Sequence, residues 1–281
     1  MRFKIIHKTE YAFSESVFLE PHYLMFKPKN APHLELESYS LKLSITPAGI
    51  SEQLDAEENF VHFCWFDGMH EKINITSEAI VNSLEYNPFN FLIYPLYFNS
   101  VPFSYSDDII VLLQKYLTAK PIHEELLQYG KTILTSKNNA TLPFLTELTI
   151  AIHTDFIVES REEGIPFKPE ITFQLKKGSC RDLVWMQIHL LRNLGIASRF
   201  VSGYYYVDVE NPIYELHAWT EVFIPGAGWI GFDPSNGIIT GHTHIAVATS
   251  SHYRNTMPVS GTLRGNATSK LTTTLAIEIL D

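Results

Sequence analysis

One cysteine of this sequence stands where a reactive thiol would be expected. Cys180 follows Gly178 and Ser179 and comes directly before a strongly apolar helical segment, Arg181 to Leu194. The unpaired N–H groups and the dipole at the start of a helix stabilise a thiolate, which is the nucleophilic form of cysteine. The same N–H groups can bind the oxyanion that forms when a carbonyl is attacked. By position alone, however, a cysteine before a helix is more often a packing residue than a nucleophile.

A histidine and an acid occur where they could serve such a thiol. His217 lies in an alternating strand pattern, where burying an imidazole without a hydrogen-bond partner would be costly. Asp233 ends the next predicted strand, which returns through the turn at 225–228, so the two strands should be neighbours. Taken singly, His217 would be a core histidine and Asp233 a turn residue before Pro234. Their joint occurrence with Cys180 favours a Cys-His-Asp acyl-transfer site.

The predicted register of the two strands leaves a mismatch. A plain hairpin centred between Gly226 and Ala227 would set His217 opposite Asn236 rather than Asp233. We therefore expect a bulge or an asymmetric loop to bring the imidazole and the carboxylate together.

The periodicity changes along the chain in an order typical of an α+β protein. Strand-like alternation dominates the first hundred residues, where Asp67-Gly68 is a plausible hairpin turn. Helical periodicity follows, and 161–177 is expected to be a polar connector before the helix that Gly195 ends. The predicted helices are 107–117, 124–134, about 142–160 and 181–194. The predicted later strands are 197–207, 214–223, 229–232, 245–248 and 271–280.

The composition indicates a globular protein without a nucleic-acid or membrane partner. The chain has 281 residues, 45% of them hydrophobic, and a formal net charge of -10 without a cluster of Lys and Arg. Its start turns polar before a signal-peptide core could form, and no apolar stretch of about eighteen residues occurs. We therefore expect a cytoplasmic protein. The two cysteines predict no disulfide framework, and Cys64, in an aromatic run, is expected to be buried and inert.

Four segments of the chain resemble the transglutaminase-like superfamily, specifically its bacterial branch with an N-terminal β domain. These segments are 177–182, 194–204, 217–222 and 228–237. The resemblance implies that Cys180 is the nucleophile, His217 the general base and acid, and Asp233 the group that orients the imidazole. It also implies a papain-like α+β core, in which helices pack on an antiparallel sheet.

A thinner likeness extends the resemblance over most of the chain and suggests its division. Residues 7–11 resemble the family's opening strand, and 244–248 resemble the strand after the core. We predict an N-terminal β-rich domain at 1–104, a transglutaminase-like catalytic core at 105–240 and C-terminal strands completing the fold at 241–281.

Two departures from the family pattern stand out in the sequence. The segment 249–258 lacks the acidic residues of the family's usual loop, and Ser179 replaces a more usual Val. The first change could alter what enters the cleft, whereas the second should alter little.

The reaction implied is attack of the Cys180 thiolate on a peptide or carboxamide carbonyl, with protonation of the leaving nitrogen by His217. Release of the thioester to water would make a peptidase or amidase, which we favour because no acceptor-site feature is evident. Release to an amine would make a transglutaminase. Gln174 is a candidate second oxyanion donor by chemistry only. Tyr204–Tyr206 and Trp219 could line a substrate groove or belong to the sheet core.

Two other classes of function are weaker alternatives. A metal site could use His242, His244 and His252, with Cys180 or Asp233 as further ligands, but the pattern has no Cys-rich or His-Glu-x-x-His frame. A non-catalytic binding module could retain the fold, and the altered loop favours it, whereas retention of all three site residues speaks against it. We therefore predict an enzyme without a metal or other cofactor, whose partner is a peptide or protein carboxamide substrate. The oligomeric state is left open.

Overall fold

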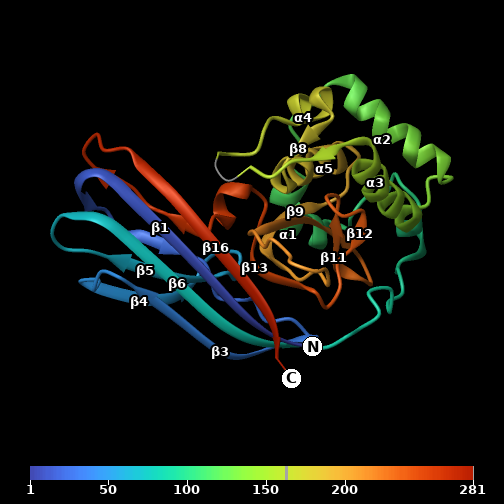
Figure 1. Ribbon diagram of the computed structural model, residues 1–281. Coiled ribbons are helices and arrows are strands. Elements are labelled where there is room, and N and C mark those ends of the chain that lie inside the picture. The colour runs from blue at the N-terminus through green and yellow to red at the C-terminus, as the bar shows by residue number, and fades with distance from the viewer. Residues whose placement is uncertain (162–163, 281) are drawn as a thin grey trace.

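A β-sandwich and a helix-covered sheet make up the protein, which a computed structural model describes at residues 1–161 and 164–280 (Figure 1). The predicted α+β class is confirmed. The helices are α1 (Asp107–Leu117), α2 (Glu124–Ser136), α3 (Thr141–Asp155), α4 (Pro169–Leu175) and α5 (Cys180–Asn193), with 3-10 turns η1 (Leu96–Asn99) and η2 (Tyr253–Thr256). None of the helices in the described ranges is long and apolar enough to cross a membrane.

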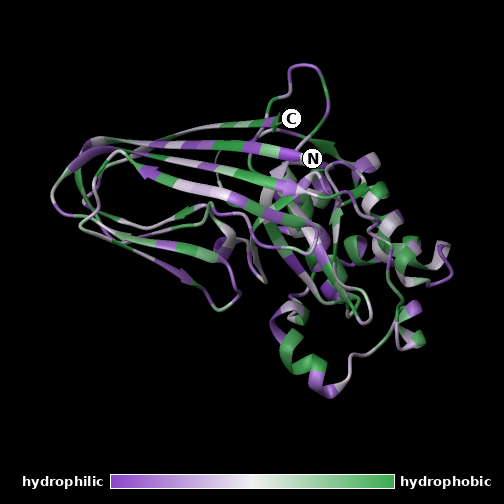
Figure 2. Ribbon diagram, turned by 90° about the horizontal axis from the view of Figure 1, so that it is seen from below, coloured by the Kyte–Doolittle hydropathy of each residue, from purple (hydrophilic) through white to green (hydrophobic). Residues whose placement is uncertain are grey.

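Two antiparallel sheets form the sandwich from both ends of the chain. The larger sheet has the order β15-β1-β6-β3, with β16 also paired to β1, and the smaller has the order β14-β2-β5-β4. Their strands are β1 (Arg2–Leu19), β2 (His22–Leu24), β3 (Leu34–Leu43), β4 (Gly49–Leu54), β5 (Phe60–Trp65), β6 (His70–Ser83), β14 (Val259–Ser260), β15 (Leu263–Arg264) and β16 (Ser269–Leu280). Figure 2 shows hydrophilic and hydrophobic residues alternating along the long strands, as one buried and one exposed face require.

The Asp67-Gly68 turn does not close a hairpin, so this prediction is wrong. The strands on either side of it, β5 and β6, lie in different sheets: β5 pairs with β2 and β4, and β6 with β1 and β3. Gly68 adopts a φ of +81°, which suits glycine, but the turn carries the chain from one sheet to the other. Alternation of apolar and polar residues predicts which face of a strand is buried, but it does not predict which strands pair with it.

The core sheet has the order β12-β11-β10-β9-β13 and carries α5 on one face. Its strands are β9 (Ser198–Tyr205), β10 (His217–Ile224), β11 (Gly228–Asp233), β12 (Ile238–Ile239) and β13 (His244–Ser250). Apolar side chains of α3 and α5, among them Leu148, Leu183 and Met186, pack with Val222 of β10 and Phe232 of β11 on the sheet's inner face. Gly195, with a φ of +78°, follows the end of α5 as predicted.

Short elements occur where the sequence predicts other structure. The connector predicted at 161–177 contains a short helix, α4, and the helix predicted at about 142–160 ends at Asp155, before β7 (Ile157–Val158), which pairs in parallel with β8 (Lys177–Gly178). The C-terminal strands also divide, because β13 joins the core sheet whereas β14, β15 and β16 join the sandwich. Short elements and sheet membership depend on tertiary pairing, which local periodicity does not encode.

An apolar contact and a polar contact hold the sandwich against the core. In the apolar contact, Phe3 and Ile5 of β1 pack with Tyr204 and Ile245 of the core sheet. The polar contact is made by the β4–β5 loop, whose fully buried Asn59 bonds to the backbone of Thr249 in β13 at 2.8 and 3.0 Å.

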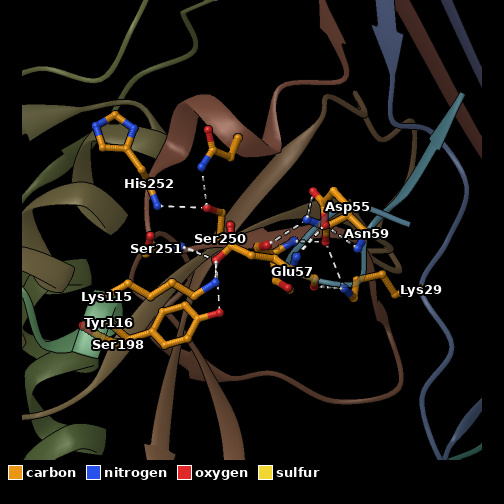
Figure 3. A network of polar contacts seen from close by, with 12 residues as sticks. Lys29, Asp55, Glu57, Asn59, Lys115, Tyr116, Ser198, Ser250, Ser251 and His252 are labelled. Carbon is orange, nitrogen blue, oxygen red and sulfur yellow. Dashed lines mark hydrogen bonds and ion pairs between the residues drawn. The ribbon is translucent and has the colours of Figure 1, made fainter. Parts of the chain in front are cut away.

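Glu57 of the same loop reaches the helices of the core (Figure 3). Its carboxylate accepts hydrogen bonds from the Tyr116 hydroxyl (3.0 Å) and the Ser251 N–H (3.1 Å) and pairs with Lys115 (3.0 Å). These contacts fix the position of the sandwich relative to the core, because each buried polar group has its partner on the other side.

Candidate active site

Cys180 is the first residue of α5, and a buried carboxylate fixes the turn that presents it. Asp182, which is 0% exposed, accepts hydrogen bonds at Oδ2 from the Ser179 N–H (2.7 Å) and hydroxyl (2.6 Å). Its Oδ1 accepts from the Arg161 guanidinium (2.6 Å) and the Phe167 N–H (2.7 Å). The helix start is therefore tied to the preceding loop. The first N–H groups of α5, which lack intrahelical acceptors, remain available to an oxyanion.

His217 and Asp233 meet through a diagonal pair rather than a bulge. Strands β10 and β11 pair Thr220 with Phe232 and Ile224 with Gly228, so their loop has three residues. This asymmetric loop was one of the two expected solutions. Continued in register, His217 would still lie opposite Ser235. The diagonal neighbours on one face are close enough for the imidazole Nε2 to reach Asp233 Oδ2 at 2.7 Å.

The imidazole of His217 connects the thiol with the carboxylate. Cys180 lies close enough to the imidazole to contribute to its pKa, while Nε2 is engaged by Asp233. Burial would lower the pKa of His217, but the charge and hydrogen bond of Asp233, together with Cys180, raise this pKa to about 10. The histidine therefore holds a proton at neutral pH, and its charge stabilises a neighbouring thiolate.

Asp233 is fully buried and saturated with hydrogen bonds. Its Oδ2 accepts from His217 (2.7 Å), from Asn236 Nδ2 (2.7 Å) and from His244 Nε2 (3.2 Å). Its Oδ1 accepts from the N–H groups of Ser235 (3.0 Å) and Asn236 (3.3 Å). Burial would raise the pKa of Asp233, but the positive charge of His217 and these hydrogen bonds hold the pKa well below its usual range. The carboxylate therefore stays ionised.

Sequence reasoning missed His244 as a partner of Asp233. The residue is 5% exposed, and its ring stacks on Tyr205 with 4.3 Å between centroids. Burial lowers the pKa of His244, so it is neutral at pH 7, with Nε2–H facing Asp233 and Nδ1 accepting from the Gly241 N–H at 3.5 Å. The signal that could have found it is the pairing of β9 with both β13 and β10, which brings the first residue of β13 to the same edge of the sheet as the first residue of β10.

Of the residues considered for a metal site, the structure brings His244 and Asp233 together and places His252 apart from them. His252 lies against Trp185, 5.0 Å between centroids, and its Nδ1 accepts the Arg254 N–H. Within the described residues, one group has ligand atoms within 4.8 Å of one another: His217, Asp233 and His244. Both imidazoles of that group direct Nε2 at the same carboxylate oxygen at hydrogen-bond distances. At these distances both imidazoles act as hydrogen-bond donors to the Asp233 carboxylate.

Cys180 and His217 line a cavity of about 320 Å³. Gln174, the candidate second oxyanion donor, is exposed on α4 and is not among the residues that line it. Trp219 and Tyr204 are 2% and 1% exposed and belong to the sheet core, which was the alternative reading of these aromatics. Cys64 is fully buried as expected, and burial raises its pKa to about 11.

Two segments of the chain match known families. Residues 3–82 match the bacterial transglutaminase-like N-terminal region, and residues 134–234 match the transglutaminase-like superfamily. The chain belongs to the transglutaminase-like superfamily. The second match spans all three residues of the thiol, imidazole and carboxylate chain, and the first covers most of the strands that form the sandwich.

Relatives of this superfamily member occur in several bacteria. The uncharacterized protein Rv2569c of Mycobacterium tuberculosis is 24% identical over 279 residues, covering 95% of this chain and 88% of the relative. The uncharacterized protein YebA of Bacillus subtilis is 33% identical over 98 residues, which are 29% of this chain and 13% of that protein. A crystal structure described as a Putative Cysteine Protease from Cytophaga hutchinsonii covers 100% of this chain and 92% of its own, with 20% identity and a TM-score of 0.71. At this identity the likeness shows the shared transglutaminase-like fold.

Proposed function

We propose that the protein is a cysteine-dependent acyl-transfer enzyme that hydrolyses peptide or carboxamide bonds. The observation that carries the proposal is the unbroken series of side-chain contacts from Cys180 through His217 to the buried Asp233, at the start of α5. Membership of the superfamily supports the general class, and the geometry supports the roles of the three residues.

In the first step, the Cys180 thiolate attacks the carbonyl carbon and forms a tetrahedral intermediate. The oxyanion would be bound by the N–H groups at the start of α5, to which Cys180 belongs. His217 then gives its proton to the leaving nitrogen, the C–N bond breaks, and the acyl group remains on sulfur as a thioester. Asp233 keeps the imidazole oriented throughout and stabilises its charged form.

In the second step, water attacks the thioester. His217, now neutral, takes a proton from the water and keeps it, and the C–S bond then breaks to release a carboxylic acid and the Cys180 thiolate, which restores the thiolate–imidazolium pair. An amine in place of the water would give a new amide instead. Both outcomes use the same residues of the chain and differ only in which acceptor reaches the thioester.

The test is the rate of iodoacetamide labelling against pH, read separately at the two cysteines by peptide mass spectrometry. Cys64 is the internal control, because it is fully buried and its pKa is raised to about 11. We expect Cys180 to label rapidly well below pH 8 in the wild type and to lose this reactivity in His217→Ala. Labelling of Cys180 that follows an ordinary thiol near pH 8.5 in both proteins would sink the catalytic assignment.

A second measurement distinguishes hydrolysis from amine transfer. A library of peptides bearing Gln and backbone amides is incubated with the protein, with and without a primary amine, and the products are weighed by mass spectrometry. Hydrolysis adds the mass of water across the cleaved bond, whereas amine transfer exchanges ammonia or the leaving amine for the added amine. Products that need the added amine would replace the hydrolase assignment with the transferase.

A further inference from the structure

The sandwich contributes a regular patch of side chains to the cavity that contains Cys180. Three directly opposed pairs of β1 and β16 line it, and each pair has its side chains on the same face of the sheet. The pairs are His7 with Leu275, Thr9 with Thr273, and Tyr11 with Leu271. We call these six residues the sandwich wall.

The sandwich wall lies at a seam in one face of the large sheet. Towards one end of β1, Phe3 and Ile5 are covered by the core, and towards the other end Val17 and Leu19 pack in the interior of the sandwich. The wall residues occupy the stretch between these two covered regions. A face that is buried on both sides and opens onto a cavity in the middle is the expected position of a binding surface.

The sandwich wall is held in place relative to the histidine of the site. His7 contacts the buried Tyr204 hydroxyl of β9 at 3.3 Å. Tyr214, which lies in the segment that leads into β10, forms a β-bridge with Leu275 of β16. The wall therefore contacts β9, the neighbour of the histidine's strand, and the segment that leads into that strand, so substrate lying on it would be positioned against the reacting groups.

The chemistry of the sandwich wall is apolar and hydroxylic. Burial lowers the pKa of His7 to about 4, so none of the six side chains carries a charge at neutral pH. The charged residues lining the same cavity, Arg161, Arg181 and Glu215, come from the core. An uncharged wall stabilises an apolar side chain lying against it and disfavours an ionised one, because that charge would lose water without an oppositely charged partner among the six residues.

We propose that the sandwich wall is the specificity surface of the enzyme and selects an apolar residue in the acyl part of the substrate. The inference rests on the proposed function for the identity of the reacting bond. It assigns the domain ahead of the core a direct role in substrate binding, with β1 and β16 as the strands that make the contact.

The test compares two affinity labels of Cys180, the chloromethyl ketones of acetyl-leucine and of acetyl-lysine. In the wild type, we expect the leucine reagent to react about tenfold faster than the lysine reagent. Thr273→Glu places a carboxylate in the wall and should lower this ratio by about tenfold. Thr274→Glu is the matched control, because it adds the same charge to the next residue of β16, which points to the opposite, solvent-facing side of the sheet and does not line the cavity.

A further variant guards against a trivial loss of folding. Thr273→Lys should reverse the electrostatic effect and favour the chloromethyl ketone of acetyl-glutamate over that of acetyl-lysine, which an unfolded protein could not do. Equal effects of the changes at 273 and 274, or no effect of either, would overturn the inference. The ratio of the two labelling rates does not depend on how fast Cys180 reacts. Slow labelling with the expected ratios would therefore contradict the proposed catalytic function but support the binding surface.

Discussion

Two fully buried carboxylates, Asp182 and Asp233, stand on either side of the reacting pair and perform different work. Among the residues that the structure describes, Asp182 accepts from the Arg161 guanidinium, a hydroxyl and two backbone N–H groups, and from no histidine. Asp233 accepts from two imidazoles, an amide and two backbone N–H groups. The role of each carboxylate follows from its hydrogen-bond donors. The donors to Asp182 keep their protons, so Asp182 has a structural role. Asp233 accepts from a histidine that can gain and lose a proton, so it takes part in the proposed chemistry.

Substitutions of the two carboxylates are expected to differ most in their effect on catalysis. Asp233→Asn keeps the shape of the side chain but cannot stabilise the imidazolium of His217. We expect kcat/KM to fall by roughly 10³-fold or more. This is the size of loss seen when the orienting carboxylate of a catalytic triad is replaced by an amide. Kinetics on a cleaved peptide from the library would measure it. A fall of less than tenfold would mean that the carboxylate does not act through the histidine.

Asp182→Ala should have its main effect on stability. The change leaves the buried donors of Ser179 and Phe167 and the Arg161 guanidinium without an acceptor, so we expect the protein to lose about 3 kcal/mol of unfolding free energy. Urea denaturation monitored by tryptophan fluorescence would measure this loss. Asp233→Asn, measured in the same way, is the comparison. If both variants lost stability equally and activity equally, the division of roles between the carboxylates would be wrong.

His244 offers a way to sharpen the comparison, because it touches Asp233 but neither the thiol nor the substrate cavity. His244→Ala should lower kcat by roughly tenfold, since a residue that orients a catalytic group typically contributes this much. His244→Gln, which can still donate to Asp233, should recover part of the loss. Recovery by Gln would show that the hydrogen bond is the reason, whereas equal loss in both variants would point to ring packing on Tyr205.

The smallest expected effect is on the pH dependence of stability. The pKa of His217 is raised from 6.5 to about 10 by the folded state, so its contribution is fully present below pH 6.5 and is lost as the pH rises through about 10. The stability difference between the wild type and His217→Gln should therefore shrink between pH 7 and pH 10.5. Urea midpoints at these two pH values measure it. A constant difference would mean that the pair does not hold its proton in the folded state.

The candidate site residues could be picked out from the sequence, whereas their geometry could be predicted only in part. Cys180, His217 and Asp233 were singled out because each occurs in a local pattern, a helix start or a strand end, that survives folding. The partners of Asp233 were not all found, because His244 reaches it through the adjacency of β13 and β9, a choice of sheet order that alternation leaves open. The turn at Asp67-Gly68 was misread for the same reason.

Register was the second limit of sequence reasoning. The sequence predicts an asymmetric loop or a bulge between β10 and β11, and the loop has three residues. His217 is still not directly opposite Asp233 in this register. The two side chains meet as diagonal neighbours across the strand pair. Short elements were the third limit. Helix α4, with seven residues, is shorter than the window over which a helical period can be recognised.

The pairing of β1 with β16 has a consequence for biosynthesis. The two strands are partners over twelve residue pairs, from Arg2 with Leu280 to Phe13 with Ser269, although the whole core sheet lies between them in the sequence. While the ribosome is still producing the segment between them, β1 lacks this neighbour and the cavity at Cys180 lacks half of its sandwich wall. The proposed binding surface is therefore complete only after β16 has left the ribosome and paired with β1.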